Sequence, residues 1–522
     1  MKKRAAAALC GSAVALASAL TAVPPAQAVP GPAPLGAAGP AWKKCGTEEA
    51  PTLQCADVQV PLNHADPGGR KITVALARVP HTAGKSLGPL LVNPGGPGGS
   101  GVDLAGFVAS GLPKSVASRY DVIGFDPRGV GRSRPALNCL PGYFDPVRPD
   151  PVPSTSALER TNLERARAFA AACRTQHGDV LPYMDTVSAA KDLEWIRRAV
   201  GARKINYLGY SYGTYLGAVY AKLHPDRVRR MVLDSVVDPA GVWYENNLQQ
   251  DVAFEERHRA FTAWVARHDK VYGLGTDAAG VEAAWYRMRA AVAARPAQDV
   301  VGPAELEDLF LPGGYHNGYW PLLARVFSAY AVKGEEAPLV EAYRAVGAVD
   351  AAGHNGYSVY TSVMCRDAPW PRDWARWRSD NDAVHRKARF MTWSNAWYNA
   401  PCAFWPVKGL KPVDVRNDKL PPVLILQSTG DAATPYAGAV RTHRLLRRSS
   451  LVVEEGGGNH GVSLAGNACL DRHLAAYLAD GTVPRRTAGE ADATCPTLPD
   501  PKPAADSTRR FTPSHPWPLP RR

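Results

Sequence analysis

The stretch INYLGYSYGTY, residues 205–215, decides the fold class of this chain. An apolar run, 205–208, leads into the pattern G-x-S-x-G at 209–213, and a run typical of a helix follows. A strand, this motif and a helix in succession form a nucleophile elbow, a sharp turn that exposes the oxygen of Ser211. Gly209 and Gly213 fit this interpretation, since a Cβ at either position would collide where strand and helix nearly touch. The sequence therefore predicts Ser211 as a nucleophile, with a structural glycine turn as the alternative.

Apolar runs and helical patterns alternate on both sides of the elbow. Strands are expected at 71–79, 89–92, 120–125, 205–208 and 228–233, and helices at about 157–176 and 186–200. This alternation indicates an α/β fold with a mostly parallel sheet flanked by helices. This alternation of strand and helix patterns stops at about 241 and resumes with apolar runs at 423–427 and 451–453. The tryptophan-rich stretch between them predicts a helical cap at 241–410, inserted between core segments 41–240 and 411–485.

A serine nucleophile needs a histidine base and a carboxylate that orients it. In elbow-type hydrolases these partners follow the serine in the order acid, then histidine, on loops after strands. Asp431 follows the run 423–427 and His460 follows the run 451–453, so both meet this requirement. Asp234, after the strand that follows the elbow, is the rival acid. The alternatives are a helix cap for Asp431 and a surface position for His460.

The glycine loop NPGGPGGSG at 93–101 also ends a predicted strand. In a hydrolase it supplies a backbone N–H to the oxyanion hole, and we expect this donor at Gly96 and a second one at Tyr212. The same loop contains G-x-G-x-x-G, with Asp121 about 20 residues beyond it, as in a dinucleotide-binding site. That alternative leaves the serine constellation unexplained. In a third loop, at 124–133, we expect Asp126 and Arg128 to form an ion pair and turn that support the elbow, with contact to the substrate as the alternative.

The chain begins with the features of an exported protein. A basic start, an uncharged run to Val23 and A-x-A ending at Ala28 predict a signal peptide at 1–28, followed by a flexible leader or propeptide at 29–40. Eight cysteines lie beyond the signal, which predicts four disulfides in an extracellular protein. Many pairings are open, and we favour neighbours along the chain, 45–55, 139–173, 365–402 and 469–495. Residues 486–522 are expected to form a flexible, Pro-rich basic tail.

Charge and composition argue against several classes of partner. The formal net charge is +13, but the basic residues are scattered, so a nucleic-acid role is unsupported and loose association with an anionic cell wall is the most they suggest. No other apolar stretch approaches the roughly 20 residues of a membrane helix. Zinc-binding spacings are absent, so neither a metal nor a cofactor is expected. We expect a monomer.

Four motifs in order resemble the secreted bacterial tripeptidyl aminopeptidases, in the proline-iminopeptidase branch of the α/β-hydrolases. These motifs are NPGGPG at 93–98, FDPRG at 125–129, GYSYGT at 209–214 and DAATP at 431–435, with His460 after them. The resemblance spans about residues 40–495. It implies the α/β-hydrolase fold, a helical cap over the site, and Ser211, Asp431 and His460 as a catalytic triad. It also implies release of peptides from a free N-terminus. Pro94 stands where smaller proline iminopeptidases tend to have histidine, which favours tripeptide over single-proline release.

Such an exopeptidase must recognise a protonated α-amine, and this calls for a carboxylate near the serine. Candidates within the cap are Glu245, Glu255, Glu256 and Asp367, each of which is also explained as a solvated charge or an ion-pair member. A secreted lipase or carboxylesterase with the same triad is the main alternative function. A cell-wall binding protein on an inactive hydrolase scaffold is the non-enzymatic one.

Overall fold

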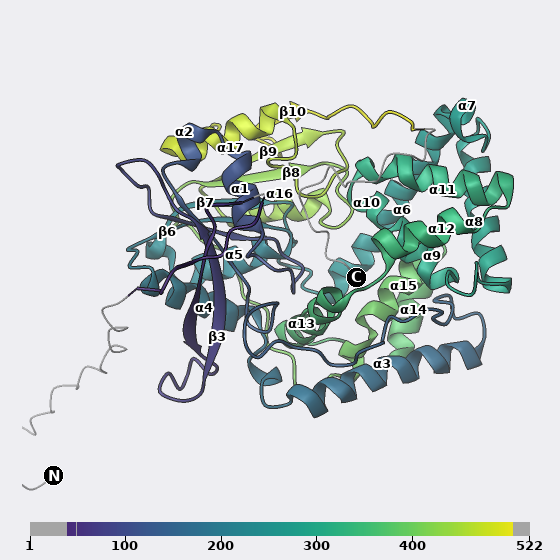
Figure 1. The fold of residues 1–522 in the computed structure, drawn as a ribbon, viewed down its shortest axis with the longest axis horizontal. Coiled ribbons are helices and arrows are strands. Elements are labelled where there is room, and N and C mark those ends of the chain that lie inside the picture. Colours follow the sequence, from purple (N-terminus) through teal and green to yellow (C-terminus); the bar gives the residue numbers. More distant parts are fainter. Residues whose placement is uncertain (1–38, 49, 505–522) are drawn as a thin grey trace, which may run out of the picture. The chain divides into compact units, whose positions relative to one another are not determined.

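The computed structural model describes residues 39–48 and 50–504, and within them one mixed sheet carries the fold. The strand order is β1-β2-β3-β5-β4-β6-β7-β8-β9-β10. Figure 1 shows β8, β9 and β10 side by side at one end of this sheet. Pairs β1–β2, β2–β3 and β3–β5 are antiparallel, and all others are parallel, which confirms the predicted sheet. The bounds are β1 Lys43–Lys44, β2 Gln54–Pro61, β3 Lys71–Val79, β4 Pro89–Asn93, β5 Asp121–Phe125, β6 Ile205–Tyr210, β7 Val228–Asp234, β8 Val423–Ser428, β9 Ser449–Glu455 and β10 Ala493–Pro496.

Helices cover both faces of the sheet, as expected for a mostly parallel arrangement. Because alternate side chains of a strand point to opposite faces, β4 separates two cores. Leu91 packs with residues of α4 and α5, whereas Leu90 and Val92 pack with residues of α1 and α17. The helices of the core are α1 Leu104–Gly111, α2 Lys114–Ala117, α4 Thr186–Ala199, α5 Tyr212–Leu223, α16 Tyr436–Leu445 and α17 Ala468–Asp480.

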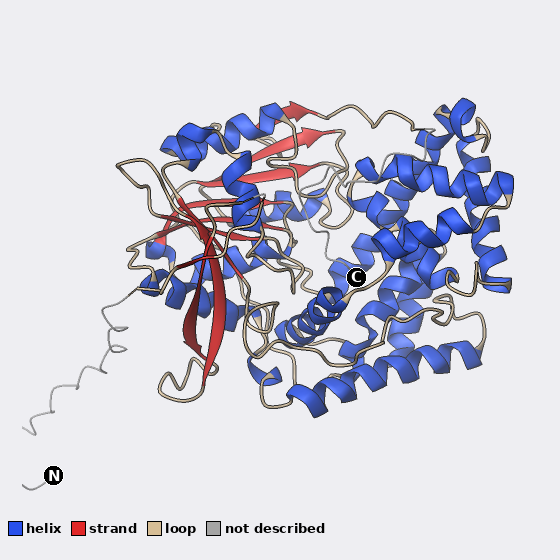
Figure 2. Ribbon diagram, in the orientation of Figure 1, coloured by secondary structure: helices blue, strands red, loops and turns tan. Residues whose placement is uncertain are grey.

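Between β7 and β8 the described chain forms helices only. Figure 2 shows these cap helices beside the carboxyl ends of the strands, where the arrowheads of β8–β10 point. They pack around an aromatic core that includes Phe254, Trp264, Trp285 and Phe327. Their bounds are α6 Tyr244–Arg267, α7 Asp269–Tyr272, α8 Ala278–Ala294, α9 Pro303–Phe310, α10 Pro312–Tyr315, α11 Trp320–Lys333, α12 Ala337–Ala342, α13 Ala351–Asp367, α14 Trp374–His385 and α15 Thr392–Asn399.

One further helix belongs with the cap although it precedes the elbow in sequence. Helix α3, Ser156–His177, packs against α15 and the short turn 400–404 rather than against the sheet (Figure 1). Thr155 caps its N-terminus by accepting a hydrogen bond from Leu158 N. The cap is therefore assembled from two stretches of the chain.

Disulfides and the C-terminal segment complete the fold. The four bridges join Cys45–Cys55, Cys139–Cys173, Cys365–Cys402 and Cys469–Cys495, which confirms the favoured pairing. The flexible tail expected from 486 instead contains β10, which pairs with β9 and carries Cys495. Pro501 O then accepts a hydrogen bond from Trp264 Nε1 of α6. The predicted signal peptide lies outside the described residues, as do most of the predicted leader and residues 505–522 of the tail.

No helix in the described ranges combines the length and apolarity that a bilayer crossing requires.

Candidate active site

Ser211 occupies the turn between β6 and α5 in a strained conformation. Its backbone has φ 54° and ψ −128°, a region that residues with a side chain rarely adopt. Ser211 N donates to Asp234 O at 3.0 Å, and Thr214 N donates to Ser211 O at 2.8 Å, so the turn is held from both sides. A Cβ on Gly213 would lie 2.8 Å from Asn93 Oδ1, and one on Gly209 would collide with Gly213 O. The two glycines thus stand where strand and helix backbones meet, as the sequence predicted.

His460 and Asp431 contact each other directly. Nδ1 of His460 lies 2.8 Å from Oδ2 and 3.0 Å from Oδ1 of Asp431. Because a carboxylate only accepts hydrogen bonds, Nδ1 carries the proton and Nε2 of the neutral ring keeps its lone pair. Asp431 is buried, and the side chain of His460 is 10% exposed. This geometry leaves Nε2 able to act as a base.

A third residue, Thr434, fixes the carboxylate of Asp431. Thr434 N donates to Oδ1 at 3.0 Å and Thr434 Oγ1 donates to Oδ2 at 2.8 Å, while Gln427 Nε2 donates to Oδ2 at 3.3 Å. Thr434 Oγ1 also lies 3.3 Å from His460 Nδ1. Sequence reasoning did not assign a role to Thr434. The sequence feature that could have indicated this role is the position of Thr434 in the same loop as Asp431, directly before Pro435.

Asp234, the rival acid, holds the backbone of the histidine loop instead of the histidine ring. Its carboxylate accepts from Val462 N at 3.0 Å and from Ser463 N at 2.7 Å. Burial raises the pKa of Asp234, and these hydrogen bonds act in the opposite direction. The cap contributes as well, because His460 N donates to Tyr315 O at 2.8 Å.

Ser211 and His460 line one cavity of about 360 Å³ between core and cap. The glycine loop from Pro94 to Ser100 forms one side of it, and α13 with Tyr315, Asn395 and Tyr398 contributes from the cap. A second cavity, of about 50 Å³, also reaches Ser211 and is lined by Gly96, Tyr212, Trp243 and Tyr360. Both cavities therefore open onto the serine.

The two expected oxyanion donors lie beside Ser211. Tyr212 is the first residue of α5, so its N–H has no partner within the helix. In the glycine loop, Gly95 N already donates to Asn93 Oδ1 at 3.0 Å, whereas Gly96 lines both cavities. A Cβ on Gly95 would lie 2.9 Å from Ser211 Cβ and 3.0 Å from Tyr212 N, so only glycine fits there. The loop is thus pressed against the elbow.

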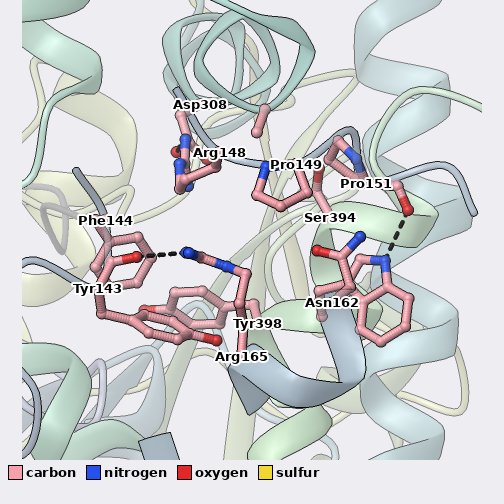
Figure 3. Close-up of a pocket in the computed structure, with 12 residues that line it drawn as sticks. Tyr143, Phe144, Arg148, Pro149, Pro151, Asn162, Arg165, Asp308, Ser394 and Tyr398 are labelled. Carbon is pink, nitrogen blue, oxygen red and sulfur yellow. Dashed lines mark hydrogen bonds and ion pairs between the residues drawn. The ribbon is translucent and has the colours of Figure 1, made fainter. Parts of the chain in front are cut away.

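Figure 3 shows the residues that line a smaller cavity, of about 60 Å³. Tyr398 lines it and the large cavity alike, and Tyr143 stacks on Tyr357 at 5.6 Å. Its two arginines are occupied, since Arg148 pairs with Asp308 at 2.6 Å and Arg165 donates to Tyr143 O at 2.6 Å. Tyr357 and Tyr398, which line the large cavity, are thus in contact with or part of the lining of this smaller one.

The ion pair expected between Asp126 and Arg128 is wrong. Arg128 instead pairs with Asp192, with Nη2 2.6 Å from Oδ1 and Nε 2.7 Å from Oδ2. Asp126 accepts hydrogen bonds from Ser100 Oγ and from the amides of Gly101 and Arg132. Two loops separated in sequence are joined by Asp126, and sequence spacing gave no sign of its partners.

The cap carboxylates singled out from the sequence do not line the large cavity. Glu245 is exposed and lies 4.0 Å from Arg376, while Glu255 is buried and accepts from Phe390 N at 2.8 Å. Glu256 is exposed. Asp367 is buried at the end of α13. The carboxylates that line the cavity are Asp103 and Asp350, which sequence reasoning did not select.

Asp367 joins the cap to the core beneath Tyr212. It accepts from Thr186 N at 2.7 Å, from Thr186 Oγ1 at 2.6 Å and from Trp243 Nε1 at 3.3 Å. Thr186 Oγ1 in turn lies 2.7 Å from Tyr212 Oη. Burial raises the pKa of Asp367 from 3.8 to about 7, although the hydrogen bonds from Thr186 act in the opposite direction.

This raised pKa predicts a pH-dependent contribution to stability. Between about pH 4 and about pH 7 the folded protein holds a proton on Asp367 that the unfolded chain has released. The contribution to the free energy of unfolding is full below about pH 4 and declines, by up to about 4 kcal/mol, until about pH 7. We expect Asp367→Asn to remove this decline, measured by urea unfolding at about pH 4.5 and about pH 8. Asp277→Asn, at the exposed cap of α8, should keep it, and an unchanged pH slope in Asp367→Asn contradicts the prediction.

One group in the described chain has metal-ligand residue types, namely Cys469, His473 and Cys495. Its two cysteines are joined in a disulfide, so neither offers a thiolate.

Comparison with known proteins identifies the family. Residues 88–321 match the model of the alpha/beta hydrolase fold, and residues 388–495 match that of TAP-like proteins. The chain is 45% identical over 481 residues to the Tripeptidyl aminopeptidase of Streptomyces lividans, across 89% of this chain and 88% of that protein. It is 33% identical to two proteins of Mycobacterium tuberculosis. These are the Serine protease Hip1, across 82% of this chain and 86% of that one, and Carboxylesterase B, across 88% and 91%. The chain therefore belongs to the tripeptidyl aminopeptidase family of α/β-hydrolases and is a serine hydrolase.

Proposed function

We propose that this protein is a secreted serine exopeptidase that releases tripeptides from free N-termini by acyl transfer. Ser211 is the nucleophile, His460 the base and Asp431 the carboxylate that orients it. Two observations carry the proposal, namely the contact between His460 Nδ1 and Asp431 and the cavity that His460 and Ser211 both line. The family supports a peptidase reaction, because the Streptomyces relative is named for tripeptidyl release.

The proposed reaction begins with proton transfer. Nε2 of His460 takes the Ser211 hydroxyl proton as the serine oxygen bonds to the scissile carbonyl carbon. The protonated ring then gives this proton to the leaving amine, the C–N bond breaks, and an acyl-enzyme remains. Water attacks the ester carbonyl carbon as it gives a proton to His460. The bond between the acyl carbon and the Ser211 oxygen then breaks as His460 returns this proton to that oxygen, and the tripeptide leaves with a new carboxylate. Asp431 stays ionised throughout and stabilises the imidazolium.

The amides of Gly96 and Tyr212 serve as the oxyanion hole in this proposal. The negative oxygen of the tetrahedral intermediate needs donors that already point at it, because reorganisation would otherwise raise the barrier. Tyr212 N sits at the positive end of α5, where negative charge is favoured. Gly96 lines both cavities that meet at Ser211.

Secretion is part of the proposal and rests on two features. The first 28 residues have the pattern of a signal peptide, and the described chain contains four disulfides, which form and persist in oxidising compartments.

A carboxylesterase is the second candidate function. It is favoured by one observation, the 33% identity to a relative named Carboxylesterase B. An ester substrate uses the same nucleophile and base, but it presents no protonated amine to the cavity.

An N-terminal release assay tests the choice. We expect the purified enzyme to hydrolyse unblocked tripeptide p-nitroanilides with a kcat/KM about 10- to 100-fold above that for their N-acetylated forms, because a hydrogen bond to a charged group contributes about 1.5–3 kcal/mol. Mass spectrometry of a longer unblocked peptide should show a product shortened by three residues. Rapid hydrolysis of aryl esters with no release from any unblocked peptide would favour the carboxylesterase instead.

A further inference from the structure

An arginine of the cap lies against the loop that carries His460. Arg257 belongs to α6, and its Cζ lies 4.9 Å from the centre of the Trp320 ring. The same guanidinium group reaches the histidine loop, because a Cβ on Gly458 would collide with Nη1 and Cζ of Arg257. Gly458 is buried and precedes the histidine by two residues. The guanidinium group therefore rests directly on the backbone that leads to His460.

The histidine loop also contacts the loop of Asp431 at this point. Gly430 N donates to Gly457 O at 2.7 Å, and a Cβ on Gly430 would lie 3.5 Å from Gly458 Cα. The backbone at 457–458 is thus in contact with the acid loop and with the guanidinium group of the cap. A side chain at position 458 would displace that group.

Packing and charge hold the guanidinium group in place. Among the described residues, Nε and Nη2 of Arg257 have no hydrogen-bond partner, although both atoms are buried. Burial lowers the pKa of Arg257. Three carboxylates raise this pKa, those of Asp500, Asp431 and Glu454. The cap ring, the loop backbone and the attraction of these carboxylates therefore fix its position.

Two hydrogen bonds join the cap to the same loop. Asn317 N donates to Asn459 Oδ1 at 2.9 Å, and His460 N donates to Tyr315 O at 2.8 Å. This segment of the cap leads into α11, which begins at Trp320, the residue whose ring lies against the guanidinium group. Three consecutive residues of the histidine loop, 458–460, are therefore fixed from the cap side.

We propose that Arg257 is a positioning residue for the base, which holds the backbone at Gly458 so that Nε2 of His460 stays aligned with Ser211. This inference rests on the proposed function, in which His460 takes the serine proton. Proton transfer requires hydrogen-bond reach, and a displacement of about 1 Å can cost about 100-fold in rate. Arg257 lines neither of the two cavities that reach Ser211, so it acts through the histidine and not on the substrate.

The chain offers a matched control on the same helix. Arg259 follows two residues later, its side chain is 54% exposed, and it pairs with Glu255 at 3.1 Å. Arg259→Ala removes an arginine from α6 but leaves the contact between Arg257 and Gly458 in place. It therefore controls for the loss of an arginine from the cap.

The first test measures hydrolysis of an unblocked tripeptide p-nitroanilide and the rate of labelling by a fluorophosphonate. In Arg257→Ala we expect kcat to fall about 10- to 100-fold with KM changed less than about threefold, because misplacing the base affects the reaction and not binding. Labelling should slow as well, since it also requires an activated serine. Arg259→Ala should match wild type in both measurements, and thermal unfolding should show that both variants are folded.

Chemical rescue distinguishes positioning from a loss of stability. Guanidinium chloride at about 0.05 M, far below the molar concentrations that unfold proteins, should raise kcat of Arg257→Ala several-fold by occupying the vacated space. Sodium chloride at the same concentration should not, and neither salt should raise kcat of wild type or of Arg259→Ala. Gly458→Ala should also lose kcat, and this loss should be smaller in the Arg257→Ala background, because the two residues are in contact.

A folded Arg257→Ala enzyme with kcat within about threefold of wild type overturns the inference, and so does a loss confined to KM. A loss of kcat that guanidinium leaves unchanged, and that simply adds to the loss in Gly458→Ala, overturns it too. If Arg257→Ala does not fold, Arg257→Met, which keeps an unbranched side chain, is judged by its kcat and KM. A wild type that is labelled but releases no tripeptide overturns the proposed exopeptidase function, while the labelling rates of the variants still decide the role of Arg257.

Discussion

Ser211→Ala should reduce kcat for an unblocked tripeptide p-nitroanilide by about 10⁴- to 10⁶-fold. The variant lacks the oxygen that forms the acyl-enzyme, and only binding and the oxyanion donors remain. Labelling by a fluorophosphonate, which reacts with an activated serine, should disappear at the same time. The measurement is steady-state hydrolysis together with mass spectrometry of the labelled protein.

A serine elsewhere provides the control. Ser110 is exposed at the end of α1, so Ser110→Ala should keep both activity and labelling. The thermal unfolding midpoint of Ser211→Ala should stay close to that of wild type, because alanine keeps the Cβ and with it the strained φ. Retention of more than about 1% of kcat in a folded Ser211→Ala enzyme refutes the role of this residue.

Asp431→Asn should reduce kcat by about 10³- to 10⁴-fold while leaving the protein folded. An amide in place of the carboxylate removes the charge that stabilises the imidazolium, and it weakens the preference for the proton on Nδ1 of His460. Asp234→Asn is the matched comparison, because both acids are buried at the carboxyl ends of neighbouring strands, Asp234 at the last residue of β7 and Asp431 shortly after β8. In Asp234→Asn an amide nitrogen faces the Val462 or Ser463 donors, so we expect a loss of about 1–3 kcal/mol of stability and a much smaller change in kcat.

The two variants distinguish two effects, namely orientation of the His460 ring by Asp431 and support of the loop after His460 by Asp234. Steady-state kinetics gives kcat, and urea unfolding gives the free energy of unfolding for each. If Asp234→Asn instead suffers the larger loss of kcat while Asp431→Asn remains active, the roles of the two acids are reversed from those proposed.

The core of the fold was predictable because its strands are buried on both faces. Such strands appear as short apolar runs, and the runs at 89–92, 228–233 and 423–427 correspond to β4, β7 and β8 within a residue or two. The alternating pattern at 71–79 corresponds to β3. Strands β1, β2 and β10 were missed, and β1 and β10 are the two edges of the sheet. Along β2 buried and exposed positions alternate with polar residues among them, and β10 is only four residues long.

The residues near the serine were predictable only where local backbone geometry constrains the sequence. The elbow glycines and the loop before His460 have this property, since each follows a strand. The cap side of the cavity has no such local constraint. Residues of α13 line the cavity only because this helix packs on the glycine loop, which the sequence does not show. Glu255, Asp367 and Asp350 are all acidic residues of the cap, so the sequence alone does not distinguish them. In the structure Glu255 and Asp367 are buried and bonded to Phe390 and Thr186, whereas Asp350 lines the cavity.

The hydrogen bond from His460 N to Tyr315 O ties the loop of the proposed base to the cap. Engineers who trim an accessory domain to obtain a minimal enzyme would here release the backbone that carries the base. Transplanting the cap onto another hydrolase meets a related obstacle, because α3 is encoded upstream of the elbow and packs with α15. A chimaera that exchanges residues 241–410 alone would leave α3 behind, and both segments have to move together.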